Sequence, residues 1–524
     1  MNKLDNNFEL ELSLELNDPD NQEALKERVA QKLGVSVEDI PPLEIKKRAV
    51  DARRGRVRFF VTVGPIEERD YELADPPLKD VAGEPVIIIG AGPAGLFCAY
   101  ELARHGIASI IVDRGKLVQA RRRDLKGLNQ HGVVDPDSNY CFGEGGAGTY
   151  SDGKLYTRSH KRGDVRDILE ILTLHGAPEA ILTDARPHIG SNRLPKVVTA
   201  LREHLEARGV RFIFEAKVVD IQVENNYAVG IKLEDGREIL GRAVVVATGH
   251  SARDMYEICE RIGAKLEAKP FAMGVRIEHP QPLINTIQYG AFANHPKLGA
   301  ASYRLAYTPS DGRGAFSFCM CPGGWIVPAS TKAGELVVNG MSLSRRNSPY
   351  ANSGLVVAIT LADLENLGLK GPLGGIILQQ RLEQAAWTAG GGALRAPAQR
   401  ASDFIARRLS TDLPSTSYEP GLKSADIHQV LNACGVALST RLAEALVAFN
   451  RSMPGYLTAE AVLVGVESRS SSPVRIVRDS NTLESPNIFR LYPCAEGAGY
   501  AGGIVSAAMD GVRIARAIQQ KLGV

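Results

Sequence analysis

The 524-residue sequence predicts an α/β fold built around a parallel β-sheet, with a small α+β domain before it and a second domain inserted into it. Three segments far apart in the chain predict this sheet. They are VIIIGAGPAG at 86–95, VVVATG at 244–249, and a strand, glycine turn and helix that begins at Leu491. Each joins a short apolar strand to a glycine turn, which is typical of parallel sheets that bind nucleotides at the carboxyl ends of their strands.

Length and composition limit the classes of protein to consider. A chain of 524 residues is too long for one compact core, so we expect roughly two to four domains. The hydrophobic content of 44%, the charged content of 23% and the net charge of +2 are ordinary, and give no general attraction to nucleic acid or acidic membranes. The seven cysteines are scattered, no apolar run is long enough for a membrane span, and the first residues do not resemble a signal peptide. We expect a cytoplasmic protein with reduced thiols.

Residues 1–63 predict a small α+β domain with the element order βαββ. The alternation in FELELSLEL at 8–16 predicts a strand, and the apolar spacing over 21–33 predicts a helix that ends at Gly34. Two more strands follow at 43–50 and 57–63, in an order typical of ferredoxin-like or ACT-like modules. The basic run KKRAVDARRGRVR within them could face RNA, but a solvated hairpin is the expectation we favour. The polar, proline-bearing residues 64–85 predict a linker.

The motif at 86–95 begins a dinucleotide-binding βαβ unit. A buried strand leads into Gly90, Gly92 and Gly95, a helix follows, and a second apolar run ends at Asp113. Gly90 permits the tight turn, Gly92 lets a pyrophosphate approach the backbone, and Gly95 lets helix and strand pack closely. The helix N-terminus then faces the phosphates, and Asp113 is placed to accept hydrogen bonds from an adenosine ribose. The alternative is a glycine turn in an ordinary βα unit, which this context disfavours.

The nucleotide domain is predicted to comprise residues 86–264 and 461–524. Its loop CFGEGGAGTYSDGKL at 141–155 holds four glycines in six residues, which lets backbone touch a flat or anionic group; a purely structural loop is the alternative. The further elements that we expect are helices at 164–176 and 195–208, strands at 210–214, 216–223, 228–233, 238–243, 243–247 and 488–492, and a final helix at 504–522.

Residues 265–460 differ from the flanking segments in their pattern of strand-like and helical stretches, which predicts an inserted substrate domain. Its first half is rich in strand-like segments, and its second half is helical from about 373 to 449. The helical half is interrupted by GGGALRAPAQR at 390–400, which could be a loop over a pocket or a plain connection between helices.

Taken together, the three nucleotide-binding segments resemble the FAD domain of the glutathione-reductase-like flavoprotein superfamily, which has a Rossmann-like fold. The resemblance implies that the first motif binds the ADP half of FAD and that the A-T-G segment closes the sheet beside the cofactor. It also implies that Glu496 contacts the ribityl chain, where the superfamily usually has Asp, and that the helix after Gly503 points its N-terminus at the flavin pyrimidine edge.

Five further segments extend the resemblance to nearly the whole chain. CFGEGGAGTYSDGKL, KPFAMGVRIEHP, SFCMCPGG, AGGGALRAPAQR and GVESRSSSPVRI, with the N-terminal module, resemble a bacterial family of uncharacterised FAD-dependent dehydrogenases. No second G-x-G-x-x-G follows a strand, so NAD(P)H would dock only transiently. Cys141 stands alone before its glycines, without the C-x4-C of disulfide reductases, so we expect no thiol–disulfide relay chemistry.

These arguments give a set of cofactor-binding candidates. They are Gly90, Gly92, Pro93, Ala94 and Gly95 in the first motif, Asp113 and Arg114 after it, Gly143, Glu144, Gly145, Gly146 and Ala147 in the glycine loop, Val218, Thr248 and Gly249 near the second motif, and Glu496, Gly497, Gly502, Gly503 and Ile504 at the third.

The substrate side is less well defined. Catalytic candidates are Lys154, Arg395 and Arg469: a lysine can tune a flavin or remain solvated, and an arginine can hold a carboxylate or an internal ion pair, here with Glu467 or Asp479. The further candidates for pocket positions are Asp152, His188, Asn192, Gln399 and Arg475.

Cys319 and Cys321 lie two residues apart on a predicted strand, so both thiols should face one side. Two ligands make no zinc site, and a disulfide between such neighbours is strained. We expect buried apolar thiols at these positions, and no metal site is predicted in the chain.

The function expected is that of an FAD-dependent oxidoreductase that transfers a hydride between flavin N5 and a small molecule. An RNA-modifying flavoprotein and a non-catalytic FAD-fold scaffold are the alternatives.

Overall fold

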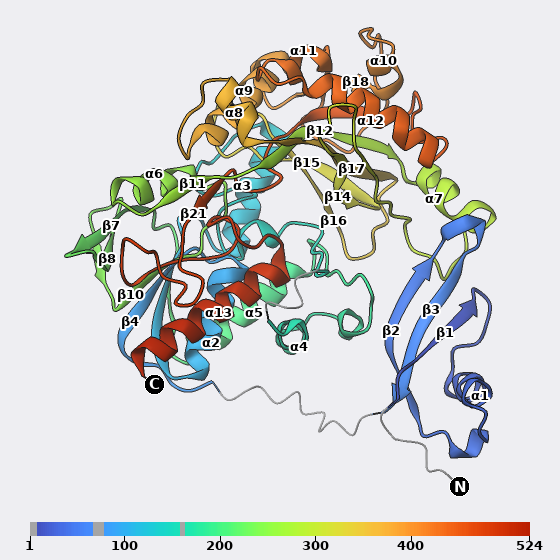
Figure 1. Cartoon of the computed structure of the whole chain (residues 1–524), viewed down its shortest axis with the longest axis horizontal. Coiled ribbons are helices and arrows are strands. Elements are labelled where there is room, and N and C mark those ends of the chain that lie inside the picture. Colours follow the sequence, from blue (N-terminus) through green and yellow to red (C-terminus); the bar gives the residue numbers. More distant parts are fainter. Residues whose placement is uncertain (1–7, 67–77, 158–162, 524) are drawn as a thin grey trace.

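The computed structural model describes residues 8–66, 78–157 and 163–523. Figure 1 shows a small N-terminal module at one side, a nucleotide domain that contains both the early helices and the final helix, and an inserted domain above them. The centre of the predicted linker, residues 67–77, lies outside the described residues. No helix in the described part of the chain combines the length and apolar character that a membrane span requires.

The nucleotide domain contains the predicted parallel sheet. Its strand order is β22-β10-β4-β5-β6, and every neighbouring pair is parallel. The bounds are β4 (Ala82–Ile89), β5 (Ile107–Val112), β6 (Arg211–Ile213), β10 (Ala243–Val246) and β22 (Leu491–Pro493). Because β10 lies between β4 and β22, the three motifs emerge side by side at the carboxyl edge of the sheet, as the sequence predicted.

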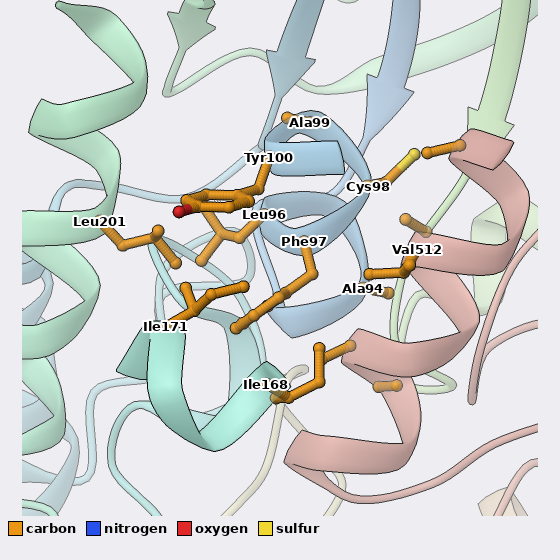
Figure 2. Packing of buried hydrophobic residues seen from close by; sticks show 14 of the residues in the cluster. Ala94, Leu96, Phe97, Cys98, Ala99, Tyr100, Ile168, Ile171, Leu201 and Val512 are labelled. Atoms are coloured by element: carbon orange, nitrogen blue, oxygen red, sulfur yellow. The ribbon is translucent and has the colours of Figure 1, made fainter. Parts of the chain in front are cut away.

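Helices cover one face of this sheet. The helices α2 (Pro93–Arg104), α4 (Val165–Leu174), α5 (Leu194–Glu206) and α13 (Ile504–Leu522) form that layer. Figure 2 shows Phe97 and Tyr100 of α2 packed toward Ile171 and Leu201, with Val512 of α13 on the opposite side of α2. A Cβ at Gly511 would lie 2.1 Å from the carbonyl oxygen of Ala94, so glycine allows α13 to cross α2 at close range. This crossing holds the N-termini of both helices at the same end of the sheet.

The opposite face carries a meander of β7 (Val218–Glu224), β8 (Tyr227–Leu233) and β9 (Glu238–Leu240), together with α6 (Arg253–Arg261). A helix that the sequence analysis missed, α3 (Val118–His131), follows β5. Its Arg121 is fully buried, and its guanidinium donates hydrogen bonds to the carbonyl oxygens of Asn139, Tyr140 and Glu144. Arg121 therefore fixes the start of the glycine loop.

The inserted domain is built on a seven-stranded sheet in the order β13-β14-β17-β12-β20-β18-β19. Its strands are β12 (Phe271–Pro280), β13 (Ala306–Tyr307), β14 (Ala315–Cys321), β17 (Tyr350–Ile359), β18 (Ala396–Arg400), β19 (Leu422–Ser424) and β20 (Val462–Glu467), with a separate ribbon of β15 (Gly324–Pro328) and β16 (Val338–Ser342). Its helices are α7 (Gln281–Tyr289), α8 (Leu361–Asn366), α9 (Gly374–Ala389), α10 (Ala401–Ile405), α11 (Ile427–Asn432) and α12 (Leu438–Ser452).

Two expectations for this region are wrong. Strand β20, which the sequence analysis placed in the nucleotide domain, pairs with β12 and β18 in the middle of the second sheet. The interruption at 390–400 is not a loop throughout, because β18 occupies its second half and is buried between β20 and β19. Burial against neighbouring strands overrides the weak strand preference of its Ala and Pro residues.

A short two-stranded neck joins the inserted domain to the nucleotide domain. Its strands, β11 (Leu266–Ala268) and β21 (Val474–Ile476), are antiparallel. The backbone N–H of Lys269 also donates a hydrogen bond of 2.9 Å to the carbonyl oxygen of Pro473. The chain therefore enters and leaves the inserted domain at one place.

The N-terminal module has the predicted βαββ order. It consists of β1 (Leu10–Glu15), α1 (Gln22–Leu33), β2 (Leu43–Asp51) and β3 (Arg58–Pro65), with the antiparallel sheet order β1-β3-β2. Asn21 caps the helix, and Gly34 ends it in a left-handed conformation. The module contacts the nucleotide domain through backbone hydrogen bonds between Arg48 and the segment 183–185.

Candidate cofactor and active site

A cavity of about 320 Å³ opens where the carboxyl edge of the parallel sheet meets the inserted domain. The predicted cofactor residues that line it are Gly90, Gly92, Pro93, Ala94, Asp113, Arg114, Gly146, Ala147, Val218, Thr248, Gly249, Glu496, Gly503 and Ile504. The catalytic candidates Lys154 and Arg469 also line it, and so does Asp152. Segments more than 400 residues apart in the sequence thus share one site.

Two helix N-termini point into this cavity without a side-chain cap. Gly92 is the N-cap of α2 and Gly503 is the N-cap of α13, and neither helix end has a capping hydrogen bond from a side chain. Free backbone N–H groups at such ends attract negative charge. A Cβ at Gly92 would find no protein atom nearer than 3.9 Å, and one at Gly503 would find none within 4 Å. This empty space beside two electropositive helix ends fits the pyrophosphate and the flavin pyrimidine edge of FAD.

Asp113 lies at the end of β5, but its carboxylate is largely occupied by backbone. Oδ2 accepts a hydrogen bond from the N–H of Ala91 (2.9 Å), and Oδ1 accepts from the N–H groups of Gly115 (2.8 Å) and Gly143 (3.0 Å). Asp113 therefore ties the first glycine turn to the glycine loop. Its predicted contact with a ribose remains a prediction, made from a side chain that is 9% exposed at the cavity wall.

Six predicted cofactor residues do not line the cavity. Gly95 has the packing role that was predicted, because a Cβ there would lie 2.0 Å from the carbonyl oxygen of Gly90. Gly497 allows a similar close approach to Thr248, and Gly502 lies against the Glu496 carboxylate. Gly143 and Gly145 adopt positive φ and pack behind the cavity, against Arg121 and Thr149 respectively.

The expectation that Glu144 lines the cofactor site is wrong. Its side chain is 1% exposed, accepts a hydrogen bond from the N–H of Val118 (2.7 Å), and pairs with Arg202 (2.7 Å). Glu144 thus caps α3 and fixes α5, and residues 143–145 lie behind the cavity, whereas Cys141, Phe142 and Gly146 to Gly148 line it.

The polar wall of the cavity begins with Asp152 and Lys154. Asp152 is 2% exposed, and its carboxylate pairs with Arg346 at 2.6 Å and with Lys154 at 3.4 Å. Burial alone would raise the pKa of Asp152, but the charges of Lys154 and Arg346 lower it to about 2. Lys154 lines the cavity with more than a third of its side chain exposed, while its ammonium group contacts the Asp152 carboxylate.

Arg469 is an ion-pair residue, but its partners differ from the predicted ones. Its guanidinium bonds Glu383 through two nitrogens, at 2.8 and 3.1 Å, and lies 3.3 Å from Glu335. Arg253 of α6 contacts the same two carboxylates at 2.8 and 3.3 Å. Two arginines and two glutamates therefore form a neutral, buried cluster between the domains. The guanidinium of Arg469 is held by this cluster at the cavity wall.

Other polar candidates lie away from the cavity. The exposed Arg395 donates a hydrogen bond to the carbonyl oxygen of Leu422, and the buried Gln399 bonds Arg408 and Ile427 backbone. Both are structural because their segment forms β18 and not a lid. The residues His188, Asn192 and Arg475 are likewise absent from the lining, the first two being bonded to Ser344 and the last lying against the Tyr500 ring.

Cys319 and Cys321 are not in the apolar surroundings that we expected. The Nζ atom of Lys154 lies 3.7 Å from the Cys319 sulfur and 3.6 Å from the Cys321 sulfur. Cys319 is half-buried and lines the cavity, whereas Cys321 is fully buried. The prediction failed because Lys154 comes from a loop 165 residues earlier in the chain.

Some lining residues were not predicted at all. Of these, the ones with polar or aromatic side chains are Cys141, Phe142, Ser151, His250, Ser251, Phe318, Asn339 and Ser470. His250 follows the A-T-G motif directly, and its Nδ1 lies 3.3 Å from the Glu496 carboxylate, so motif adjacency was a usable signal. Asn339 and Phe318 come from strands of the inserted domain and had no signal in the sequence.

Comparisons with known proteins also indicate an FAD-binding protein. Family models match residues 84–129 (FAD binding domain), 168–271 (pyridine nucleotide-disulphide oxidoreductase) and 270–470 (FAD-dependent protein, C-terminal domain-like), and residues 7–64 match a domain of unknown function. An uncharacterized protein of Clostridium beijerinckii is 39% identical over 98% of this chain and 98% of its own length.

Two more distant similarities were found. The FAD-dependent monooxygenase DEP2 of Fusarium langsethiae is 26% identical over 48% of this chain and 44% of its own length. The solved structure of a glycerol-3-phosphate dehydrogenase from Bacillus halodurans with FAD has a TM-score of 0.38 at 13% identity, covering 85% of this chain and 66% of that one. With FAD-type models matched along the chain and a relative of nearly full length, the chain belongs to a family of FAD-dependent oxidoreductases.

Proposed function

We propose that this FAD-dependent oxidoreductase acts on a small molecule that binds in the cavity between the nucleotide domain and the inserted domain. The observation that carries the proposal is the composition of that cavity. One side presents glycines and two uncapped helix ends suited to FAD, and the other presents Lys154, Cys319, Asn339 and Arg469. A cofactor site that faces a set of polar side chains, here from both domains, is the usual arrangement of a flavoenzyme active site.

When bound, FAD supplies the capacity to accept or release a hydride at N5. The protein's own residues would bind and orient the reactants. The N-terminus of α13 offers positive potential that stabilises negative charge at its end of the cavity. Lys154 lines the cavity with its side chain 37% exposed and would place a positive charge beside an anionic substrate, such as a carboxylate.

Arg469 has a different role in this proposal. Its guanidinium is only 6% exposed and is bonded to Glu383, so it is not free to follow a substrate. It would instead hold the inserted domain against α6 and so keep the cavity closed to bulk water. No residue is assigned as a general base.

The RNA-modifying alternative receives no support from the basic run of the N-terminal module. Its Arg48 pairs with Asp20, Arg53 with Asp51 at 2.6 Å, and Lys46 with Glu44 at 2.5 Å. These three of the seven basic residues in the run are thus partly neutralised by carboxylates of the same module. Membership of an oxidoreductase family likewise gives no support to the non-catalytic scaffold.

The proposal is tested by an anaerobic titration of the purified, FAD-bound protein. Flavin absorbance is followed during addition of NADH, NADPH and a panel of small hydroxy acids and amino acids. We expect bleaching with at least one compound and recovery on admission of air. If the bound flavin bleaches with dithionite but with none of these compounds, a small-molecule hydride donor of these classes is excluded.

A further inference from the structure

The end of β14 has an unusual backbone at Cys319. Cys319 has φ +44°, and the register between β14 and β17 shifts between Phe318 and Cys321. A left-handed conformation is rare for a non-glycine residue, and such strain is commonly found at functional sites. The bend places Cys319 on the cavity wall and leaves Cys321 fully buried behind it, with its thiol donating a hydrogen bond to the Cys319 carbonyl oxygen at 3.3 Å.

Charged groups surround this pair of thiols on several sides. Lys154 contacts both sulfur atoms, and Asp152 lies 3.4 Å from the Lys154 ammonium. Arg276 of β12 is fully buried, donates a hydrogen bond of 2.7 Å to the Cys319 carbonyl oxygen, and pairs with Glu467 of β20 at 2.7 Å. The hydroxyl of Tyr303 lies close enough to Cys321 for the two groups to interact electrostatically. The nearest full charge to both sulfurs is therefore positive.

The two thiols differ in how readily they ionise. The neighbouring Cys321 thiol, with the charges of Lys154 and Arg276, holds the pKa of Cys319 well below its ordinary value although burial opposes this. The neighbouring Cys319 and burial raise the pKa of Cys321. A thiolate is the reactive form of cysteine, so the accessible member of the pair is the one suited to act as a nucleophile.

The other thiols provide a contrast within the same chain. Cys98, Cys259, Cys434 and Cys494 are buried, and burial raises the pKa of each. Cys141 lines the same cavity as Cys319, but its thiol donates a hydrogen bond to the Ala329 carbonyl oxygen at 3.9 Å, and the charges that interact with it are the guanidinium groups of Arg469 and Arg121. Cys141 is thus a control thiol of similar exposure.

We propose that Cys319 and Cys321 form a redox-active thiol pair that reduces a small-molecule disulfide in the cavity, with Cys319 as nucleophile and Cys321 as the resolving thiol. This step is separate from the hydride transfer proposed above. An accessible thiolate, a second thiol directly behind it, and one ammonium in contact with both are the parts that thiol–disulfide exchange needs.

The step balances as follows. The Cys319 thiolate attacks one sulfur of the disulfide, whose S–S bond breaks, and the leaving thiolate takes a proton from the Lys154 ammonium. The neutral Lys154 amine then accepts the proton of Cys321, and the Cys321 thiolate attacks the Cys319 sulfur of the mixed disulfide. The second thiolate leaves and is protonated by water. The two thiols lose two electrons, and the substrate disulfide gains them. A disulfide between residues two apart is strained, which makes the oxidised pair more oxidising, so an excess of the substrate disulfide drives the exchange.

The first test measures thiol reactivity in the full-length, FAD-bound protein. Iodoacetamide labelling is followed by mass spectrometry of the cysteine peptides across a pH series. We expect Cys319 to react about tenfold faster than Cys141 at pH 7. Lys154→Gln should raise the pH of half-maximal Cys319 labelling by about one pH unit, while Lys154→Arg keeps it low. Equal labelling rates for Cys319 and Cys141 in the wild type would overturn the proposal.

The second test uses glutathione disulfide as the probe. Cys321→Ser should accumulate a glutathione adduct on Cys319, whereas the wild type should show a Cys319–Cys321 disulfide and released glutathione. Cys319→Ser should show neither product, and retained flavin absorbance would confirm that each variant is folded. The proposal fails if Cys321→Ser carries no adduct on Cys319, or if the adduct forms on Cys141 instead.

Discussion

One part of the cavity lining consists of glycine backbone, and another part consists of charged and polar side chains from both domains. We call the first the backbone wall, formed by Gly90, Gly92, Gly146, Gly249 and Gly503. The second, the side-chain wall, is formed by Asp152, Lys154, Cys319, Asn339 and Arg469. The glycines of the backbone wall leave space for a cofactor because they carry no side chain. The residues of the side-chain wall are held in place by ion pairs and hydrogen bonds. The two should therefore fail in different ways when they are mutated.

The largest effect is expected from adding atoms to the backbone wall. Gly92→Val should abolish FAD retention, because its side chain would occupy the space beside the α2 N-terminus and no protein atom blocks it from doing so. The purified variant should be colourless with an unchanged circular dichroism spectrum. Gly127→Val, on α3 with open space around its Cβ position, is the matched control and should stay yellow. A yellow Gly92→Val protein would remove this turn from the cofactor site.

The next largest effect is expected from removing a charge in the side-chain wall. Arg469→Ala leaves the buried Glu383 and Glu335 with Arg253 alone, and should lower the free energy of unfolding by about 3–5 kcal/mol. Arg395→Ala, which removes an exposed side chain bonded to one carbonyl, should change it by less than about 0.5 kcal/mol. Denaturant unfolding of both variants measures the contrast, and similar losses would refute it.

A smaller, pH-dependent effect is expected at Asp152. Its pKa is about 2 in the folded protein against 3.8 ordinarily, so its charged form stabilises the fold. This contribution of about 2 kcal/mol is fully present above pH 4 and is lost as the pH falls toward 2. Asp152→Asn should therefore be less stable than wild type at pH 7, and the difference should shrink toward pH 2. A difference that stays constant over this range would show that the carboxylate charge is not what stabilises the fold.

The smallest effect is expected at Asp113, the carboxylate that ties the first glycine turn to the glycine loop. Asp113→Ala leaves three backbone N–H groups without their acceptor, which should cost about 1–2 kcal/mol of stability, and should weaken FAD binding about tenfold. The domain should remain folded. Fluorescence titration of the apoprotein with FAD gives the affinity, and an unchanged dissociation constant would limit Asp113 to tying the two loops together.

The same contrast explains what could be predicted from the sequence. The backbone wall was predictable because a turn such as Gly90–Gly95 carries its geometry in its own residues: Gly90 has φ +110° and Gly95 has no room for a Cβ. The strand and helix around it are equally local. The side-chain wall depends on contacts between distant segments, such as Lys154 with Cys319 or Arg469 with Glu383. The residues next to each partner in the sequence do not indicate which distant residue it will contact.

The errors follow from the same cause. Glu144 was assigned to the cofactor because it lies among glycines, but its partner Arg202 is on a helix 58 residues later. Strand β18 was assigned to a loop because Gly and Pro surround it, although its burial between two strands decides its conformation. Local patterns predicted the elements, and long-range pairing decided which side chains face the cavity.

The neck formed by β11 and β21 has a consequence for how such enzymes can change. Because the two crossings of the chain are hydrogen-bonded neighbours, a turn of a few residues could replace everything between them without opening a long loop. The inserted domain nevertheless shares the Arg253–Glu383 pair and an apolar cluster with the nucleotide domain, so a different domain grafted at the neck would have to supply both contacts.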